Sequence, residues 1–283
     1  MRRNDVGTAR SLLFVPGDRP DRFAKAVASG ADAVVLDLED AVAPANKAAA
    51  LGHVVDFLDA LPSARSGSAA RVVVRVNPPG SETSQAELSA LAASGAARLV
   101  MVPKAESAAS LEAVLDELPT RSGTIPLVET AAGLLDVREV AAARGVLRLA
   151  FGHLDLCAQL GLSPEDERRL DPARLALVVA SAAASLPPPV DGVSTSIDDA
   201  EAITRETRSA VASGFTGRLC IHPRQVSLVH DALRPGDAEV AWARTVTGAV
   251  GVDGVAKVDG EFVDRPVVIR AEAILARARD AVG

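Results

Sequence analysis

The sequence has few aromatic residues: six Phe, one Trp and no Tyr in 283 residues. Its core must therefore be built from Ala, Val and Leu. The two cysteines, Cys157 and Cys220, stand far apart without a CxxC spacing, which argues against a disulfide framework. Long apolar runs are also absent, because no window approaches the roughly 20 residues that a membrane span requires. The apolar stretch near the N-terminus is broken by Pro16 and Gly17, unlike that of a signal peptide. We therefore expect a cytoplasmic protein that has no membrane partner.

An excess of basic residues is absent too. The net charge is −7 and the isoelectric point is about 5.2, whereas a nucleic-acid partner would favour a basic face. The apolar fraction of 48% and the charged fraction of 24% are typical of a globular protein. At this length we expect one large domain, alone or with a short appendage.

Short, continuous apolar runs recur along the chain, as in strands that are covered on both faces. Ala-rich segments with helical periodicity separate them, and several of these end at a glycine. A strand followed by a helix, eight times over, predicts a (β/α)8 TIM barrel in the α/β class. An open doubly wound sheet is the alternative, but the first strand lacks a GxGxxG turn. The predicted strands are residues 11–16, 33–38, 71–77, 98–104, 125–129, 147–152, 191–196 and 218–223.

The C-terminal segment falls outside this repeat. We place the barrel at residues 1–232 and a helical extension at 233–283. The extension contains a helix, a glycine-rich link after Val250 and a final amphipathic helix, "VVIRAEAILARARDAV". It is too short to bury a large core, so we expect it to pack on the barrel or on a neighbouring subunit.

Charged residues collect at the predicted carboxyl ends of the strands, where this fold places its chemistry. Glu129 and Asp155 follow adjacent strands, so their carboxylates could share one Mg²⁺ whose other ligands are water and substrate oxygens. A pair of solvated loop acids is the alternative. The other charged or polar residues at these ends are Asp18, Arg19, Asp37, Glu39, Asp40, Arg75, Asn77, Lys104, Glu106, His153 and His222.

Eight sequence blocks carry a resemblance to a known family. The sequence resembles the citrate lyase β-subunit-like family, the CoA-ester carbon–carbon lyase branch of the HpcH/HpaI aldolase superfamily. The blocks run in order from residue 10 into the C-terminal segment, which makes the match specific. They are "RSLLFVPGDRPDRFAKA", "DAVVLDLEDAV", "VVRVN", "MVPKAES", "PLVETAAGLL", "FGHLDL", "GFTGRLCIHPRQV" and "GEFVDRP".

The resemblance implies a Mg²⁺-dependent enzyme that cleaves or forms a 3-hydroxyacyl-CoA, with acetyl-CoA and a 2-oxo acid as products. Glu129 and Asp155 match the magnesium ligands, and Glu129 also faces substrate. Arg75 matches the arginine beside the thioester and the oxo-acid carboxylate. Asp264, in "GEFVDRP", matches an acid that relatives bring from the C-terminal segment.

Phe14 and Lys25 match positions that contact substrate or CoA in relatives. Arg19, Arg22 and Lys25 would contribute to a basic rim for the CoA phosphates, on a loop and helix start that also favour anions. Relatives commonly assemble as trimers or hexamers, so the resemblance implies a homo-oligomer in which Asp264 could act on a neighbouring subunit.

The acids of "DLED" would sit at the mouth of the barrel. We expect Glu39 and Asp40 to hold magnesium-bound waters and to orient basic neighbours, with Lys47 as a partner. Relatives commonly have an acid just before the magnesium aspartate, whereas Leu154 stands there in this chain. The choice of oxo acid therefore stays open. A metal-dependent aldolase acting on CoA-free hydroxy-oxo acids and a non-catalytic CoA-binding subunit are the alternative functions.

Overall fold

The computed structural model describes residues 6–61, 71–94, 99–249, 256–258 and 261–280. Eight parallel strands form a closed barrel in sequence order, and β8 pairs with β1 to complete it. The predicted (β/α)8 TIM barrel is therefore confirmed. Its strands are β1 (Ser11–Pro16), β2 (Ala33–Asp37), β3 (Arg71–Arg75), β4 (Leu99–Val102), β5 (Gly123–Val128), β6 (Ala150–Phe151), β7 (Val190–Asp191) and β8 (Gly217–Cys220).

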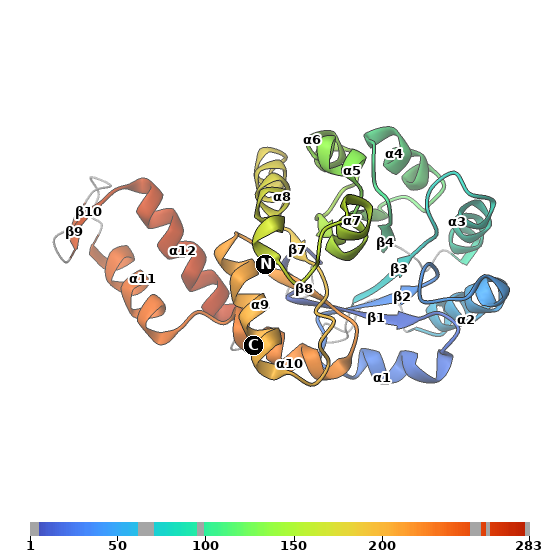
Figure 1. Ribbon diagram of the computed structural model, residues 1–283, viewed down its shortest axis with the longest axis horizontal. Coiled ribbons are helices and arrows are strands. Elements are labelled where there is room, and N and C mark those ends of the chain that lie inside the picture. The colour runs from blue at the N-terminus through green and yellow to red at the C-terminus, as the bar shows by residue number, and fades with distance from the viewer. Residues whose placement is uncertain (1–5, 62–70, 95–98, 250–255, 259–260, 281–283) are drawn as a thin grey trace. The chain divides into compact units, whose positions relative to one another are not determined.

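Helices follow the strands and surround the barrel (Figure 1). They are α1 (Phe23–Val27), α2 (Lys47–Ala60), α3 (Glu82–Ser94), α4 (Ala108–Asp116), α5 (Ala131–Leu135), α6 (Val137–Ala142), α7 (His153–Leu160), α8 (Asp171–Ala183), α9 (Ala200–Ala212) and α10 (Pro223–Leu233). Four short 3₁₀ helices accompany them, at Val6–Thr8, Pro20–Arg22, Pro44–Asn46 and Glu167–Leu170.

The last three barrel strands are shorter than the sequence predicts. Strands β6 and β7 have two residues each, and β7 and β8 each start one residue before the predicted range. The predicted ranges 147–152, 191–196 and 218–223 therefore contain two, one and three strand residues, respectively. Three prolines at 187–189 precede β7, and proline cannot donate a hydrogen bond to a strand ladder. Strand β8 ends before Pro223, where α10 begins. The apolar pattern reports burial, which extends beyond the hydrogen-bonded ladder.

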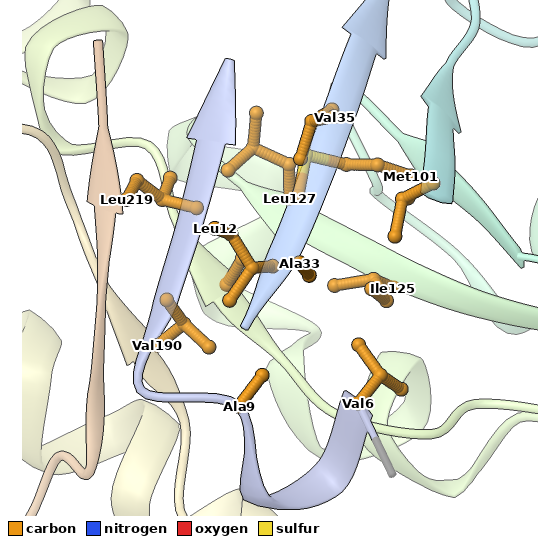
Figure 2. Close-up of a cluster of buried hydrophobic side chains, with 12 residues drawn as sticks. Val6, Ala9, Leu12, Ala33, Val35, Met101, Ile125, Leu127, Val190 and Leu219 are labelled. Carbon is orange, nitrogen blue, oxygen red and sulfur yellow. The ribbon is translucent and has the colours of Figure 1, made fainter. Parts of the chain in front are cut away.

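Small and branched apolar side chains fill the barrel interior (Figure 2). Leu12, Val35, Met101, Ile125 and Leu127 come from four different strands and are almost fully buried. The core of the barrel is therefore built mainly from small and branched apolar side chains, and Phe14 packs against it.

The N-terminal segment closes the bottom of the barrel. Val6 and Ala9 belong to the same buried cluster (Figure 2). The fully buried Arg148 donates from Nη1 to the carbonyl oxygens of Val6, at 3.2 Å, and Ala9, at 2.6 Å. The open end of the barrel is thus the carboxyl end of the strands.

The chain divides into two compact units, residues 1–229 and 230–283, and α10 spans the division. The second unit contains α11 (Asp237–Ala249), an antiparallel ribbon of β9 (Ala256–Val258) and β10 (Glu261–Val263), and α12 (Arg265–Asp280). Ala271 and Ile274 of α12 cluster with Ala243 and Val246 of α11. The apolar face of the final helix therefore has a partner within its own unit. Most of the predicted glycine-rich link lies outside the described residues.

Across the described ranges, we find no helix with the length and hydropathy needed to cross a membrane.

Candidate functional site

A cavity of about 320 Å³ opens at the carboxyl ends of the barrel strands. Residues on or just after strands β1, β2, β3, β5, β6, β7 and β8 line it. The structure thus brings together seven charged, polar or aromatic residues that the sequence singled out from five separate blocks. These seven are Phe14, Asp37, Asp40, Arg75, Glu129, His153 and Asp155.

Arg75 ends β3 and is held by two carboxylates. Its Nε and Nη2 donate to Asp37 Oδ1 and Oδ2 at 2.7 and 2.6 Å. The register explains this pair, because Asp37 and Arg75 are direct partners in the β2–β3 ladder. Arg75 Nη1 also lies 2.8 Å from Glu39 Oε2. These acids raise the pKa of Arg75 against the opposing effect of its burial, so the guanidinium stays charged.

Within the protein, the two-point contact of Arg75 is made to Asp37. A guanidinium has five N–H groups, and the hydrogen bonds to Asp37 use two of them, while the contact with Glu39 is an ion pair. Arg75 still lines the cavity, so its remaining N–H groups can face a bound oxygen. Phe14 lies against the guanidinium, with 4.9 Å between the ring centroid and Cζ, and this contact helps to fix the plane.

Lys104, just beyond β4, links two buried acids. Its Nζ donates to Glu39 Oε1 at 2.8 Å, and its backbone N–H donates to Glu129 Oε1 at 2.9 Å. The backbone of Lys104 is left-handed, with φ of 48°, a conformation that costs energy for a residue with a Cβ. The strained turn brings the ammonium group and the amide of one residue onto neighbouring carboxylates. The sequence placed Lys104 at a strand end but assigned it no role.

Glu129 and Asp155 follow the paired strands β5 and β6. Glu129 is buried, and desolvation together with the charge of Glu39 raises its pKa to about 8. The charge of Asp155 contributes in the same direction. Burial and neighbouring acids thus favour the neutral form of Glu129. A cation beside this carboxyl group would lower its pKa and restore the anion.

Gly152 makes room for the Glu129 side chain. A Cβ at this position would lie 2.4 Å from Glu129 Cβ and 2.5 Å from Oε2. Among the described residues, no group of three or more His, Cys, Asp and Glu side chains could hold a metal ion. Two carboxylates that leave the remaining positions to water and ligand are the donor set of Mg²⁺, so the residues fit that ion.

Lys47 does not contact the carboxylates for which it was the predicted partner. Its Nζ donates to the backbone carbonyls of Leu38 and Glu39 and to Asn77 Oδ1, at 2.8–2.9 Å. The ammonium group thus fixes the backbone of the loop after β2. Asp40 is exposed at the cavity wall, whereas Glu39 is buried. Burial raises the pKa of Glu39 despite the nearby Arg75.

His153 is a buried cavity residue whose role the sequence left open. Its Nδ1 has no hydrogen-bond partner among the described residues. Burial lowers its pKa to about 4, so the imidazole is neutral at pH 7. A Cβ on Gly192 would lie 1.9 Å from Nδ1, so this glycine permits the ring position.

Arg19 and Lys25, the predicted CoA-binding residues, are exposed near the start of α1. Arg19 donates from Nε and Nη2 to Asp21, with both distances 3.1 Å. Asp264 belongs to the second unit, where its Oδ1 accepts from the backbone N–H of Val267 at 3.4 Å, at the start of α12. Arg19 and Asp264 thus each have a hydrogen-bond partner within three residues in the sequence.

A closed parallel barrel with a charged cavity at its carboxyl end is the arrangement of (β/α)8 barrel proteins that bind ligands at that face. The chain belongs to the HpcH/HpaI aldolase/citrate lyase family, whose model matches residues 10–223. The resemblance drawn from the sequence blocks is thereby confirmed.

The names of similar proteins describe more than one function. The chain is 42% identical over 280 residues to a citrate lyase subunit beta-like protein of Mycobacterium tuberculosis, with 95% of each chain covered. It is 34% identical over 277 residues to a (3S)-malyl-CoA thioesterase of Cereibacter sphaeroides, covering 95% of this chain and 94% of the relative. It also resembles the structure of protein CitE from Mycobacterium tuberculosis in complex with magnesium, acetoacetate and coenzyme A. That match has a TM-score of 0.82 and 38% identity, and covers 97% of this chain and 100% of the other.

Proposed function

We propose that this chain is a Mg²⁺-dependent carbon–carbon lyase acting on a 3-hydroxyacyl-CoA such as malyl-, citramalyl- or citryl-CoA. The products of cleavage would be acetyl-CoA and a 2-oxo acid. The observation that carries the proposal is the pair of carboxylates, Glu129 and Asp155, on adjacent strand ends in a cavity lined by Arg75. The related CitE structure with magnesium, acetoacetate and coenzyme A supports it.

The residues divide the chemistry among them. Glu129 and Asp155 would hold Mg²⁺, which when bound supplies Lewis-acid stabilisation of oxygen charge. Arg75, oriented by Asp37 and Phe14, would donate its remaining N–H groups to the thioester or carboxylate oxygen. Asp264 would exchange a proton with the methylene carbon of the acetyl group.

Other charged residues would support this centre or hold CoA. Glu39 orients Arg75 and Lys104, Lys47 fixes the loop behind Glu39, and Asp40 stands at the cavity wall. Arg19 and Lys25 would meet the CoA phosphates, and Arg19 would leave Asp21 to do so.

The test is to incubate the protein with Mg²⁺ and each of the three CoA esters. We expect equal amounts of acetyl-CoA and a 2-oxo acid from at least one ester, and loss of both products with EDTA. Turnover confined to CoA-free hydroxy-oxo acids would instead identify an aldolase. Magnesium binding without turnover of any thioester would indicate a CoA-binding subunit.

Thioester hydrolysis is a second candidate, because a relative of similar length is named (3S)-malyl-CoA thioesterase. The same assay separates the two reactions. Hydrolysis releases free CoA thiol and a hydroxy acid, whereas carbon–carbon cleavage releases a 2-oxo acid and keeps the thioester intact in acetyl-CoA.

Gly152→Ala tests whether Mg²⁺ binding depends on the position of the Glu129 side chain. The added methyl group would occupy the space of the Glu129 side chain and push its carboxylate away from Asp155. We expect Mg²⁺ affinity to fall by about 10- to 100-fold, as when the support of a ligand is lost. Isothermal titration with Mg²⁺ measures this. Gly52→Ala is the control, since its Cβ meets nothing within 4 Å on helix α2, and it should leave the affinity unchanged.

The oligomer and the role of Asp264 have a joint test. We expect a homo-oligomer, a trimer in the first instance, in which Asp264 of one subunit serves the site of another. Asp264→Ala and Arg75→Ala subunits would each be inactive alone, but unfolding and refolding them together should recover part of the activity. A monomer by light scattering, together with an inactive mixture, would contradict action between subunits.

A further inference from the structure

One side of the cavity is apolar. Leu219 of β8 and Ile221, the first residue after this strand, both line the cavity. Figure 2 shows the Leu219 side chain directed into the barrel. Phe14 on β1 and Val193 after β7 line the cavity as well and pack on the same interior cluster. We call these four residues the apolar wall. It occupies three consecutive strand ends around the barrel, because β7 pairs with β8 and β8 with β1.

The other side holds the charges, and most of them are negative. Four acids line the cavity, whereas Arg75 is the one lysine or arginine among its described lining residues. Arg75 is ion-paired to both Asp37 and Glu39. Lys104 stands nearby, but its Nζ is bonded to Glu39 and lies 3.7 Å from Glu129. The guanidinium of Arg75 lies against Phe14 at one edge of the apolar wall, 4.9 Å from the ring centroid, and it is already ion-paired to two acids.

We propose that the 2-oxo acid bound at this site carries an alkyl side chain and not a second carboxylate. This inference specifies the substrate of the proposed lyase and rests on that proposed function. The carboxylate and 2-oxo group of the substrate belong beside Glu129 and Asp155. The group at C3 of the oxo acid then meets the apolar wall. An alkyl group is stabilised as it leaves water there, whereas a carboxylate loses its hydration and meets only Arg75, whose charge Asp37 and Glu39 already balance.

Two ligands of the same size and shape test this directly. Oxaloacetate and 4-methyl-2-oxopentanoate share the 2-oxo carboxylate and differ in having a carboxylate or an isopropyl group at the far end. We expect the alkyl acid to bind the Mg²⁺-loaded protein at least about tenfold more tightly, which is the effect of one or two methyl groups in an apolar pocket. Isothermal titration of the full chain in excess Mg²⁺ gives both dissociation constants. Equal or tighter binding of oxaloacetate would overturn the inference.

A cation placed on the apolar wall should reverse the preference. Ile221 is 43% exposed, so Ile221→Arg can present its guanidinium to the cavity without entering the core. We expect this variant to bind oxaloacetate more tightly than 4-methyl-2-oxopentanoate. Leu135→Arg is the matched control, because Leu135 is 85% exposed on α5 and does not line the cavity, and it should keep the order of the parent protein. Circular dichroism establishes that both variants are folded.

The outcomes separate this inference from the proposed function. Tight binding of the alkyl acid without cleavage of any CoA ester would keep the alkyl specificity and reject the lyase. Cleavage of citryl-CoA faster than of citramalyl-CoA would keep the lyase and reject the alkyl specificity. If neither oxo acid binds in the presence of Mg²⁺, both are rejected.

Discussion

Replacing Glu129 with glutamine is expected to abolish Mg²⁺ binding and, with it, Mg²⁺-dependent turnover. Glutamine keeps the shape of the side chain and can still accept the backbone N–H of Lys104, which bonds to Glu129 Oε1 at 2.9 Å. It cannot carry the negative charge. Since the lost cation is worth several kcal/mol of transition-state stabilisation, kcat should fall by at least about 10³-fold. Asp155→Asn should act in the same way, because the proposed site has only these two carboxylate ligands.

The measurements for Glu129→Gln are steady-state turnover, Mg²⁺ titration and thermal unfolding. Burial and Glu39 already raise the pKa of Glu129 to about 8 in the absence of a cation, so a neutral side chain is compatible with the fold. We therefore expect an unchanged or higher melting temperature without Mg²⁺. Glu139→Gln, an exposed acid on α6, is the control. A crystal structure with Mg²⁺ and oxaloacetate in which the cation lies away from Glu129 would contradict the assignment.

Much of the barrel could be predicted because parallel strands that are buried on both faces have continuous apolar sequences. Strand β2, Ala33–Asp37, is buried at every position, and its predicted range is longer by only one residue. The same pattern places the charged residues at strand ends. It says nothing about ladder hydrogen bonds, so the short β6 and β7 could not be foreseen.

The contacts inside the site depend on register, which the sequence does not reveal. Asp37 and Arg75 are 38 residues apart, and they meet because β2 and β3 align at that level. The partners of the buried acids could not be predicted for the same reason. Lys47 donates to backbone carbonyls and not to a carboxylate of "DLED". The carboxylate of Glu39 contacts Arg75 and Lys104 instead.

Two backbone features of the site, at Lys104 and Gly152, could not be predicted from the local sequence either. Nothing in "VPKAES" marks Lys104 as left-handed, because such a conformation in a residue other than glycine is imposed by its surroundings. Gly152 could be taken for a simple strand-end glycine, yet its missing Cβ is the space that Glu129 occupies. Both features concern the position of one carboxylate, which supports the view that its placement matters for function.

Arg75→Lys is the second change with a large expected effect. Arg75 forms a two-point contact with Asp37, a third contact with Glu39 and a stacking contact with Phe14. An ammonium group keeps the positive charge but cannot make this planar set of contacts. Its position would vary, and it would donate to Asp37 or to a bound oxygen but not to both. We therefore expect turnover to fall by about 10²- to 10³-fold, as when a fixed donor to a developing oxyanion is lost.

A comparison of kcat with stability decides whether Arg75 contacts the reaction or only braces the barrel mouth. Arg75→Lys retains a cation beside buried Asp37, so the loss of stability should be much smaller than the 3–5 kcal/mol typical of a buried pair that loses one partner. Arg169→Lys is the matched control, because Arg169 forms an exposed pair with Asp166, and such pairs contribute little. If Arg75→Lys lowers the melting temperature but keeps the turnover of the parent protein, Arg75 is structural. A fall in kcat at nearly constant stability, with Mg²⁺ affinity retained, would show that the guanidinium acts on the substrate, because the metal ligands are then intact.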